Sequence, residues 1–181
     1  WLKYICKMIN FFKNIFLKYK LKKRLKVLKF QSKGEIKSLD SMLILTSNNE
    51  FDENIFFSLA ESLKISTKKI TLVVISDKKL PKAITKFGQI INLTKERVGL
   101  FGTLDKEMLK FFDQKFDLLI NYFSLSDIFP EFISASCSSK LRLGFYEVNH
   151  EISDIVFNLN LKDKQAFLNE SINYLNSFLK K

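Results

Sequence analysis

The pattern of hydrophobic positions from residue 41 onward alternates between two kinds of segment. Short continuous apolar runs have the length of buried strands, and the run ITLVVIS is also rich in β-branched residues. Between 83 and 102 the pattern is weaker, because 90–93 and 98–101 are both strand candidates and the sequence does not decide between them. The predicted strands occupy 41–47, 70–76, 116–122 and 141–147, with a more alternating one at 152–161.

Segments with helical spacing lie between these runs. Each begins at a residue suited to a helix N-terminus and then carries apolar residues every three or four positions. The predicted starts are Asp52, Thr103, Ser126 and Asp163. Because strands alternate with helices, the sequence predicts an α/β fold: a three-layer, Rossmann-like sandwich with a mostly parallel sheet of about five strands.

An amphipathic helix is predicted to precede this domain. Its apolar stripe begins with Trp1, Ile5, Met8, Phe12, Ile15 or Phe16, and Tyr19, and continues with Leu21, Leu25 and Leu28. Lysines interrupt the apolar residues, so no stretch of about 20 remains for a membrane-spanning helix. The chain starts with Trp1, and Met8 is an alternative natural start. We predict a helix and linker at 1–38 and a Rossmann-like domain at 39–181, which we expect to fold without the helix.

Charge is concentrated in the N-terminal part. Residues 1–40 contain twelve Lys or Arg and two acidic residues, a net charge of +10, whereas residues 41–181 contain eighteen and seventeen, a net charge of +1. Such a helix can bind nucleic-acid phosphates or an anionic membrane, or it can dock its apolar stripe on its own domain and leave the cations in solvent. The candidate polyanion-binding residues are Lys18, Lys20, Lys22, Lys23, Arg24, Lys26 and Lys29.

The polar residues that follow the predicted strands are the second candidate site, because α/β sheets bind ligands at the carboxyl ends of their strands. The candidates are Ser47, Asn48, Asn121, Ser124 and Ser126. The glycine-rich patterns of dinucleotide sites and P-loops do not occur, so the sequence excludes a standard NAD, FAD or P-loop site. Asp77 follows the second strand and is expected to be an exposed loop residue.

Catalytic and metal-binding motifs are not found either. The single histidine, His150, has acidic neighbours in the sequence but is expected to lie exposed in a loop. Cys6 and Cys137 lack the spacing of a disulfide framework or a zinc site, which favours a reducing cytoplasm. We therefore assign no catalytic residue, cofactor or metal ligand.

Two segments carry a family resemblance. FDLLINYF (116–123) and SKLRLGFYEVNHEISDIVFNL (139–159), followed by a terminal helix ending in YLNSFLKK, resemble an uncharacterised family of short Bacteroidota proteins. A fainter similarity links FDLLINYF, SASCSS and LRLGF to the N-terminal half of heptosyltransferase-like glycosyltransferases. Those enzymes have two Rossmann domains, and this chain has room for one. The first family implies the Rossmann-like fold and supplies no activity.

Two functions follow from these observations. The first is a non-catalytic interaction module, attached by its basic helix to RNA, to an anionic membrane surface or to an acidic protein, and located in the cytoplasm or at the inner face of the membrane. The second is a small enzyme or binding protein for a phosphorylated or sugar-nucleotide metabolite at the strand ends, supported by fold analogy alone. The charge distribution favours the first.

Overall fold

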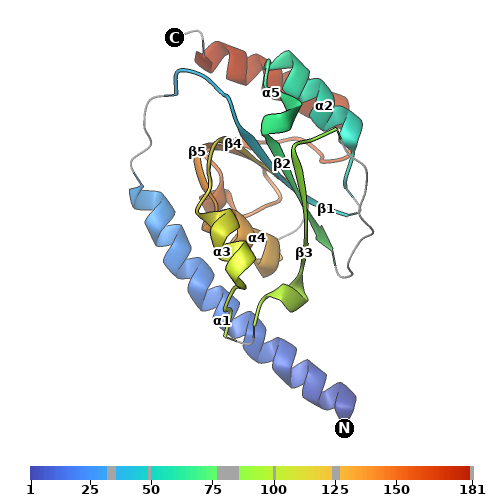
Figure 1. Cartoon of the computed structure of the whole chain (residues 1–181), viewed down its shortest axis with the longest axis vertical. Helices are drawn as coiled ribbons and strands as arrows, with labels where there is room; N and C mark the ends of the chain where they lie inside the picture. Colours follow the sequence, from blue (N-terminus) through green and yellow to red (C-terminus); the bar gives the residue numbers. More distant parts are fainter. Residues whose placement is uncertain (32–35, 49, 77–85, 100, 124–126, 180–181) are drawn as a thin grey trace.

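The chain forms a six-stranded parallel sheet in the order β3-β2-β1-β4-β5-β6 (Figure 1). The computed structural model describes residues 1–31, 36–48, 50–76, 86–99, 101–123 and 127–179. The α/β class and the parallel sheet are as predicted, with six strands instead of about five. The strands are β1 (Met42–Ser47), β2 (Ile70–Ser76), β3 (Gln89–Thr94), β4 (Lys115–Tyr122), β5 (Ser138–Phe145) and β6 (Ile155–Phe157).

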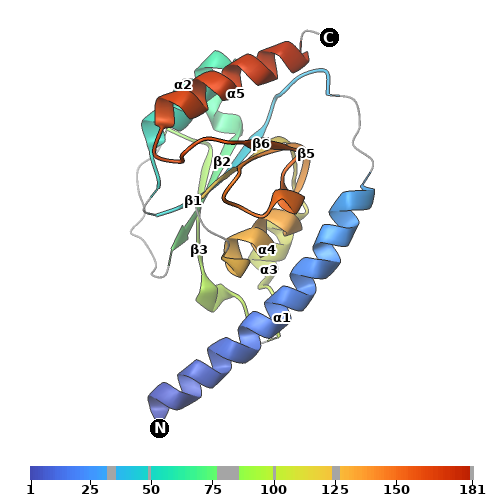
Figure 2. The ribbon, with the colours of Figure 1, turned by 180° about the vertical axis from the view of Figure 1, so that it is seen from behind.

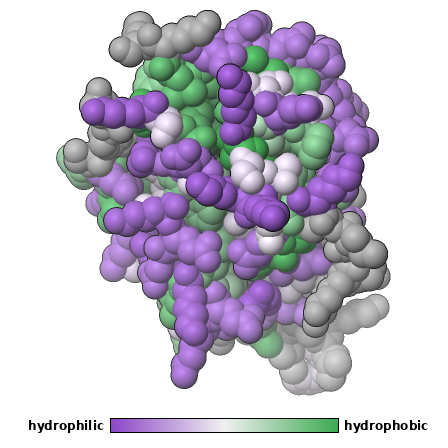
Figure 3. Space-filling model, turned by 45° about the horizontal axis from the view of Figure 1, so that its top comes forward, coloured by the Kyte–Doolittle hydropathy of each residue, from purple (hydrophilic) through white to green (hydrophobic). Residues whose placement is uncertain are grey.

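Helices cover both faces of the sheet. The helices are α1 (Leu2–Phe30), α2 (Glu53–Ser62), α3 (Lys106–Phe112), α4 (Ile128–Ser136) and α5 (Lys164–Leu179), with short 3₁₀ turns η1 (Thr67–Lys69), η2 (Lys95–Arg97) and η3 (His150–Ile152). Figures 1 and 2 show α2 and α5 together on one face and α3 and α4 on the other, with α1 running along the outside of α4. The face that carries α2 and α5, brought forward in Figure 3, is largely hydrophilic, with hydrophobic side chains between the polar ones.

Several local predictions are corrected or decided. Asp127, and not Ser126, caps α4, because its side chain accepts a hydrogen bond from the Phe129 amide at 3.2 Å. Asp105 caps α3 in the same way, so this helix starts later than Thr103. Of the two strand candidates between 83 and 102, the first lies in β3, while Val98 forms only an isolated antiparallel bridge with Leu104.

Aromatic rings fill the space between the sheet and the α2–α5 layer. Tyr122 of β4 meets Phe56 of α2, Phe145 of β5 and Phe167 of α5 edge to face, with ring centroids 5.0–5.4 Å apart. Its hydroxyl donates a hydrogen bond to the Leu161 carbonyl oxygen at 3.0 Å, so the buried polar atom is satisfied. This cluster joins both α2 and α5 to the centre of the sheet.

On the opposite face of the sheet, α4 packs on the strands and α1 packs on the outer side of α4 (Figure 1). Every residue of α4 from 129 to 136 is buried, including the polar Glu131 and Ser134. Leu17 and Leu21 of α1 are buried against this layer, and Leu25 and Leu28 are partly buried beside them. The amphipathic helix therefore docks on its own domain. Independent folding of residues 39–181 stays a prediction, and the burial of these leucines argues against it.

The loop after η2 also contacts α1. Gly102 has φ +65°, a left-handed conformation that favours glycine, and a Cβ there would lie 3.1 Å from Cδ of Lys20. Lys20 donates a hydrogen bond to the Gly102 carbonyl oxygen at 2.7 Å. The Phe16 and Phe101 rings meet edge to face at 5.0 Å. The loop thus holds the middle of α1 through both a polar and an aromatic contact.

Asp117 fixes the chain where it enters the sheet after α1. Its carboxylate accepts hydrogen bonds from the Asp40 and Ser41 amides at 2.9 and 3.0 Å, and Lys140 Nζ lies 2.7 Å from its other oxygen. Burial opposes ionisation of this side chain, but the hydrogen bonds from Lys140, Asp40 and Ser41 outweigh it, so the pKa of Asp117 lies below its usual value.

We predict that shortening the buried leucines of α1 destabilises the whole protein. Leu17→Ala and Leu21→Ala should each lower the free energy of unfolding by about 2–4 kcal/mol, because each leaves a cavity between α1 and α4. Ile15→Ala is the matched control on the same helix, since Ile15 is 46% exposed, and should change stability by less than about 0.5 kcal/mol. Urea denaturation of the three variants measures this, and equal effects at all three positions would show that α1 is not docked as described.

We also predict a pH-dependent effect at Asp117. Because the pKa of Asp117 is depressed in the folded state, its carboxylate stabilises the fold above the unfolded pKa, and this contribution disappears as the pH falls through the folded value. Asp117→Asn should cost about 1–2 kcal/mol at neutral pH, and the difference from the unsubstituted protein should shrink below about pH 4. Denaturation at a series of pH values tests this; a difference independent of pH would contradict it.

Candidate functional site

The α1 helix has two apolar sides that face in opposite directions. Each residue advances about 100° around a helix, so the step from Tyr19 to Leu21 turns about 200°. The predicted continuous stripe is therefore wrong at this step. Residues up to Tyr19 in that stripe lie on one side, while Leu21, Leu25 and Leu28 lie on the other and are the ones that pack on the domain.

The side of α1 that turns away from the domain is apolar in its N-terminal half. We define the outer apolar face as Tyr4, Met8, Phe11, Phe12, Ile15 and Tyr19, whose side chains are between 46 and 78% exposed. Their three-to-four residue spacing places them on one side of the helix. Figures 1 and 2 show that the N-terminal turns of α1 extend beyond the sheet and its covering helices. None of the described helices is apolar enough over sufficient length to span a membrane.

Five of the seven candidate cations continue this side of α1 toward its C-terminal end, whereas Lys20 and Arg24 turn toward the domain. Six of the seven are exposed, whereas Lys20 is half-buried and bonded to Gly102 as described above. Lys23 Nζ lies 4.7 Å from the centroid of the Tyr19 ring, a cation–π contact between the two parts of the surface. The six exposed cations are Lys18, Lys22, Lys23, Arg24, Lys26 and Lys29, and no carboxylate in the described part of the chain forms an ion pair with them.

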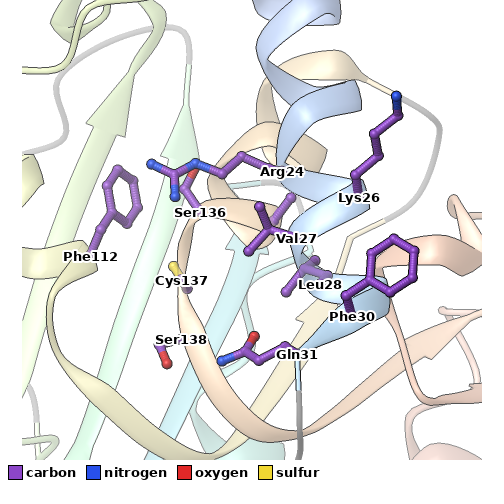
Figure 4. Close-up of a pocket in the computed structure, with 11 residues that line it drawn as sticks. Arg24, Lys26, Val27, Leu28, Phe30, Gln31, Phe112, Ser136, Cys137 and Ser138 are labelled. Carbon is purple, nitrogen blue, oxygen red and sulfur yellow. The ribbon is translucent and has the colours of Figure 1, made fainter.

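A pocket of about 610 Å³ lies beside the C-terminal end of α1, between it and the ends of α3 and α4 (Figure 4). In Figure 4, Arg24 reaches from α1 toward Phe112 and Ser136, while Lys26 points away from them. Cys137 lines the pocket but is 4% exposed, and burial raises the pKa of its thiol to about 12. The thiol therefore stays protonated at neutral pH and is a poor nucleophile.

The second candidate site lies where the strand order reverses, between β1 and β4. Ser47 Oγ donates a hydrogen bond to the Glu50 carboxylate at 2.6 Å. The backbone N–H of the exposed Asn48 donates to the Ile75 carbonyl oxygen at 3.1 Å. Asn121 is fully buried, and its side-chain amide group donates to the Ile152 carbonyl oxygen and to Ser153 Oγ, so it is not exposed to a ligand at this edge. Ser124, Ser126 and Asp77 lie outside the described residues.

Carboxylates occupy the positions where a Rossmann site would bind phosphate. Asp52 caps α2, and the pKa of Asp52 is lowered chiefly by its hydrogen bond from Lys164, so it is ionised at neutral pH. Asp127 caps α4 and pairs with Lys95 at 2.9 Å. Burial, together with the charges of Asp52 and Glu50, raises the pKa of Tyr122 to about 12. Negative charge at both helix N-termini disfavours an anionic ligand there.

His150 and Arg142 form hydrogen bonds with backbone carbonyl oxygens. His150 is exposed in η3, as predicted, and its Nε2 lies 2.8 Å from the Tyr146 carbonyl oxygen instead of a carboxylate. Arg142, which sequence reasoning did not single out, is 2% exposed and donates to the carbonyl oxygens of Ser134 and Cys137 at the end of α4. Burial lowers the pKa of Arg142 to about 10, so it remains charged and complements the helix C-terminus. No group of three potential metal ligands occurs among the described residues.

Comparison with known proteins gives one match. The sequence matches a family of unknown function, DUF6913, over residues 13–178. This confirms the predicted membership of an uncharacterised family, while no link to Bacteroidota or to heptosyltransferases is shown. No curated protein matches the chain, and no solved structure does.

Proposed function

The chain belongs to the family of unknown function DUF6913, and we propose that it is a non-catalytic interaction module that binds a polyanionic partner through the outer side of α1. One observation carries the proposal: five cations on the outer side of α1, Lys18, Lys22, Lys23, Lys26 and Lys29, are exposed and are not paired with any described carboxylate. The other side of the helix is fixed to the domain. The backbone that carries these cations is already ordered by its contact with the domain, so binding a partner costs little backbone conformational entropy.

The distribution of charge supports this function. The first acidic residue of the chain is Glu35, so α1 contains none, whereas the part from 41 onward is nearly neutral with a net charge of +1. A single-sign surface of this kind attracts an oppositely charged partner over about 10 Å at physiological salt and accelerates its association. We keep the cytoplasm as the proposed location and assign no catalytic residue or cofactor.

The metabolite-binding alternative is supported by the order of the strands. The order β3-β2-β1-β4-β5-β6 is that of dinucleotide-binding Rossmann folds, with the reversal between β1 and β4. The carboxylates of Asp52 and Asp127 at this edge argue against a phosphorylated ligand. Thermal denaturation with nucleoside diphosphates and their sugar conjugates separates the two functions, because a concentration-dependent rise in the melting temperature would favour the alternative.

We predict that reversing two exposed charges of α1 weakens polyanion binding strongly. At low salt the full chain should bind at least one of two probes, polyuridylic acid or vesicles containing anionic lipid. If about five cations contact RNA phosphates, log K should fall with log salt with a slope near −3.5. Lys22→Glu with Lys26→Glu should weaken binding at least about tenfold while leaving the melting temperature unchanged, because both side chains are exposed.

The matched control makes the same charge change elsewhere. Lys68 and Lys69 are also exposed and lie in η1, so Lys68→Glu with Lys69→Glu changes the net charge equally without touching α1. This variant should bind nearly as well as the unsubstituted chain. Equal weakening by both pairs would mean that net charge, and not the surface of α1, determines binding. No binding to either probe at low salt would overturn the proposed function.

A further inference from the structure

We infer that the polyanionic partner is the surface of an anionic lipid bilayer, on which α1 lies with its outer apolar face in the interfacial region. This inference rests on the proposed function, because the same helix supplies the cations. It goes further by using the side chains from Tyr4 to Tyr19, which polyanion binding alone leaves unexplained.

The size and exposure of the outer apolar face are the first argument. Tyr19 lies fifteen positions after Tyr4, so the face runs along about 22 Å of helix. Its six side chains are each at least 46% exposed, and the Phe11 and Phe12 rings lie edge to face with their centroids 5.9 Å apart. Contiguous apolar surface of this kind marks a site for a protein, a ligand or a membrane.

The composition of the helix identifies which of these occupants fits. Tyr4 and Tyr19 have amphipathic rings suited to the level of lipid headgroups, whereas Met8 and Ile15 are suited to the acyl region below it. Lys18, Lys22, Lys26 and Lys29 follow the same side of the helix, and α1 contains no acidic residue. A bilayer with anionic lipids uses both features together, since basic residues attract the surface and apolar area holds the helix in it. RNA bases could stack on the rings but not on Met8 or Ile15.

The way α1 docks on the domain leaves its outer apolar face accessible to a flat surface. Leu17 and Leu21 fix the helix to α4 on the opposite side from Ile15 and Tyr19, so the domain lies behind the outer apolar face. The N-terminal turns extend beyond the sheet and its covering helices, so a flat surface can approach them without meeting the domain first (Figures 1 and 2). No described helix could cross the membrane, so the contact proposed is peripheral.

The experiment uses the full chain and three probes: phosphatidylcholine vesicles, vesicles with about 30% phosphatidylserine, and polyuridylic acid. Trp1 is the only tryptophan, is fully exposed and lies at the start of α1, so its fluorescence reports this end of the helix. With anionic vesicles we expect its emission to shift to shorter wavelength and to be quenched by bromine-labelled lipid. With phosphatidylcholine alone we expect neither change.

Two variants test the role of the apolar side chains. Phe11→Ser with Phe12→Ser should weaken vesicle binding at least about tenfold, and should change RNA binding less than about twofold because the cations remain. The matched control is Tyr174→Ser with Phe178→Ser, since these α5 rings are stacked at 6.5 Å and are 42 and 41% exposed. The control variant should bind vesicles as the unsubstituted chain does.

Each other outcome has a definite meaning. Salt-dependent binding to polyuridylic acid without binding to anionic vesicles would overturn the bilayer inference and leave the proposed function standing. Vesicle binding that Phe11→Ser with Phe12→Ser does not weaken, or that occurs without quenching of Trp1, would also overturn it, since α1 would then not enter the interface. No binding to any probe at low salt would overturn both proposals.

Discussion

The contact between the inner side of α1 and α4 is the interaction on which the rest of this structure depends. The α4 helix is buried on all sides because the sheet covers one side and Leu17 and Leu21 cover the other. Arg142 then donates hydrogen bonds to the buried carbonyl oxygens of Ser134 and Cys137 at the end of α4. Without α1, an apolar side of α4 would face solvent, which argues against independent folding of residues 39–181.

The same contact determines what α1 can do for function. A helix docked along one side presents its opposite side in a fixed orientation, and in this chain that side is apolar toward the N-terminus and basic toward the C-terminus. The rest of the chain, from residue 41 onward, adds little net charge. The described surface of α1 therefore combines exposed apolar side chains with exposed cations, and the Rossmann-like sheet acts as its support. At the edge of that sheet, Asp52 and Asp127 take the positions where a phosphate would bind.

The sequence predicted those features that depend on local pattern. The run ITLVVIS became β2 with the predicted bounds because continuous β-branched residues suit a strand buried on both faces. In contrast, β5 begins at Ser138, where polar residues pair with β4 and give no hydrophobic signal. The two sides of α1 were present in the spacing, but only its packing on α4 shows which side is buried. Likewise, Asn121 turns inward because its partner Ile152 lies 31 positions away in the sequence. Arg142 turns inward because the fold brings the end of α4 against β5.

Amide hydrogen exchange along α1 tests most directly whether one side of this helix is held by the domain while its N-terminal turns are free. The account predicts that amides from 17 to 28 exchange nearly as slowly as those of β1 and β4, because they open only when the domain unfolds. Amides from 2 to 12 should exchange much faster, since no described contact holds them to the domain. Fast exchange along the whole of α1, at the rate of its first turns, would contradict the account.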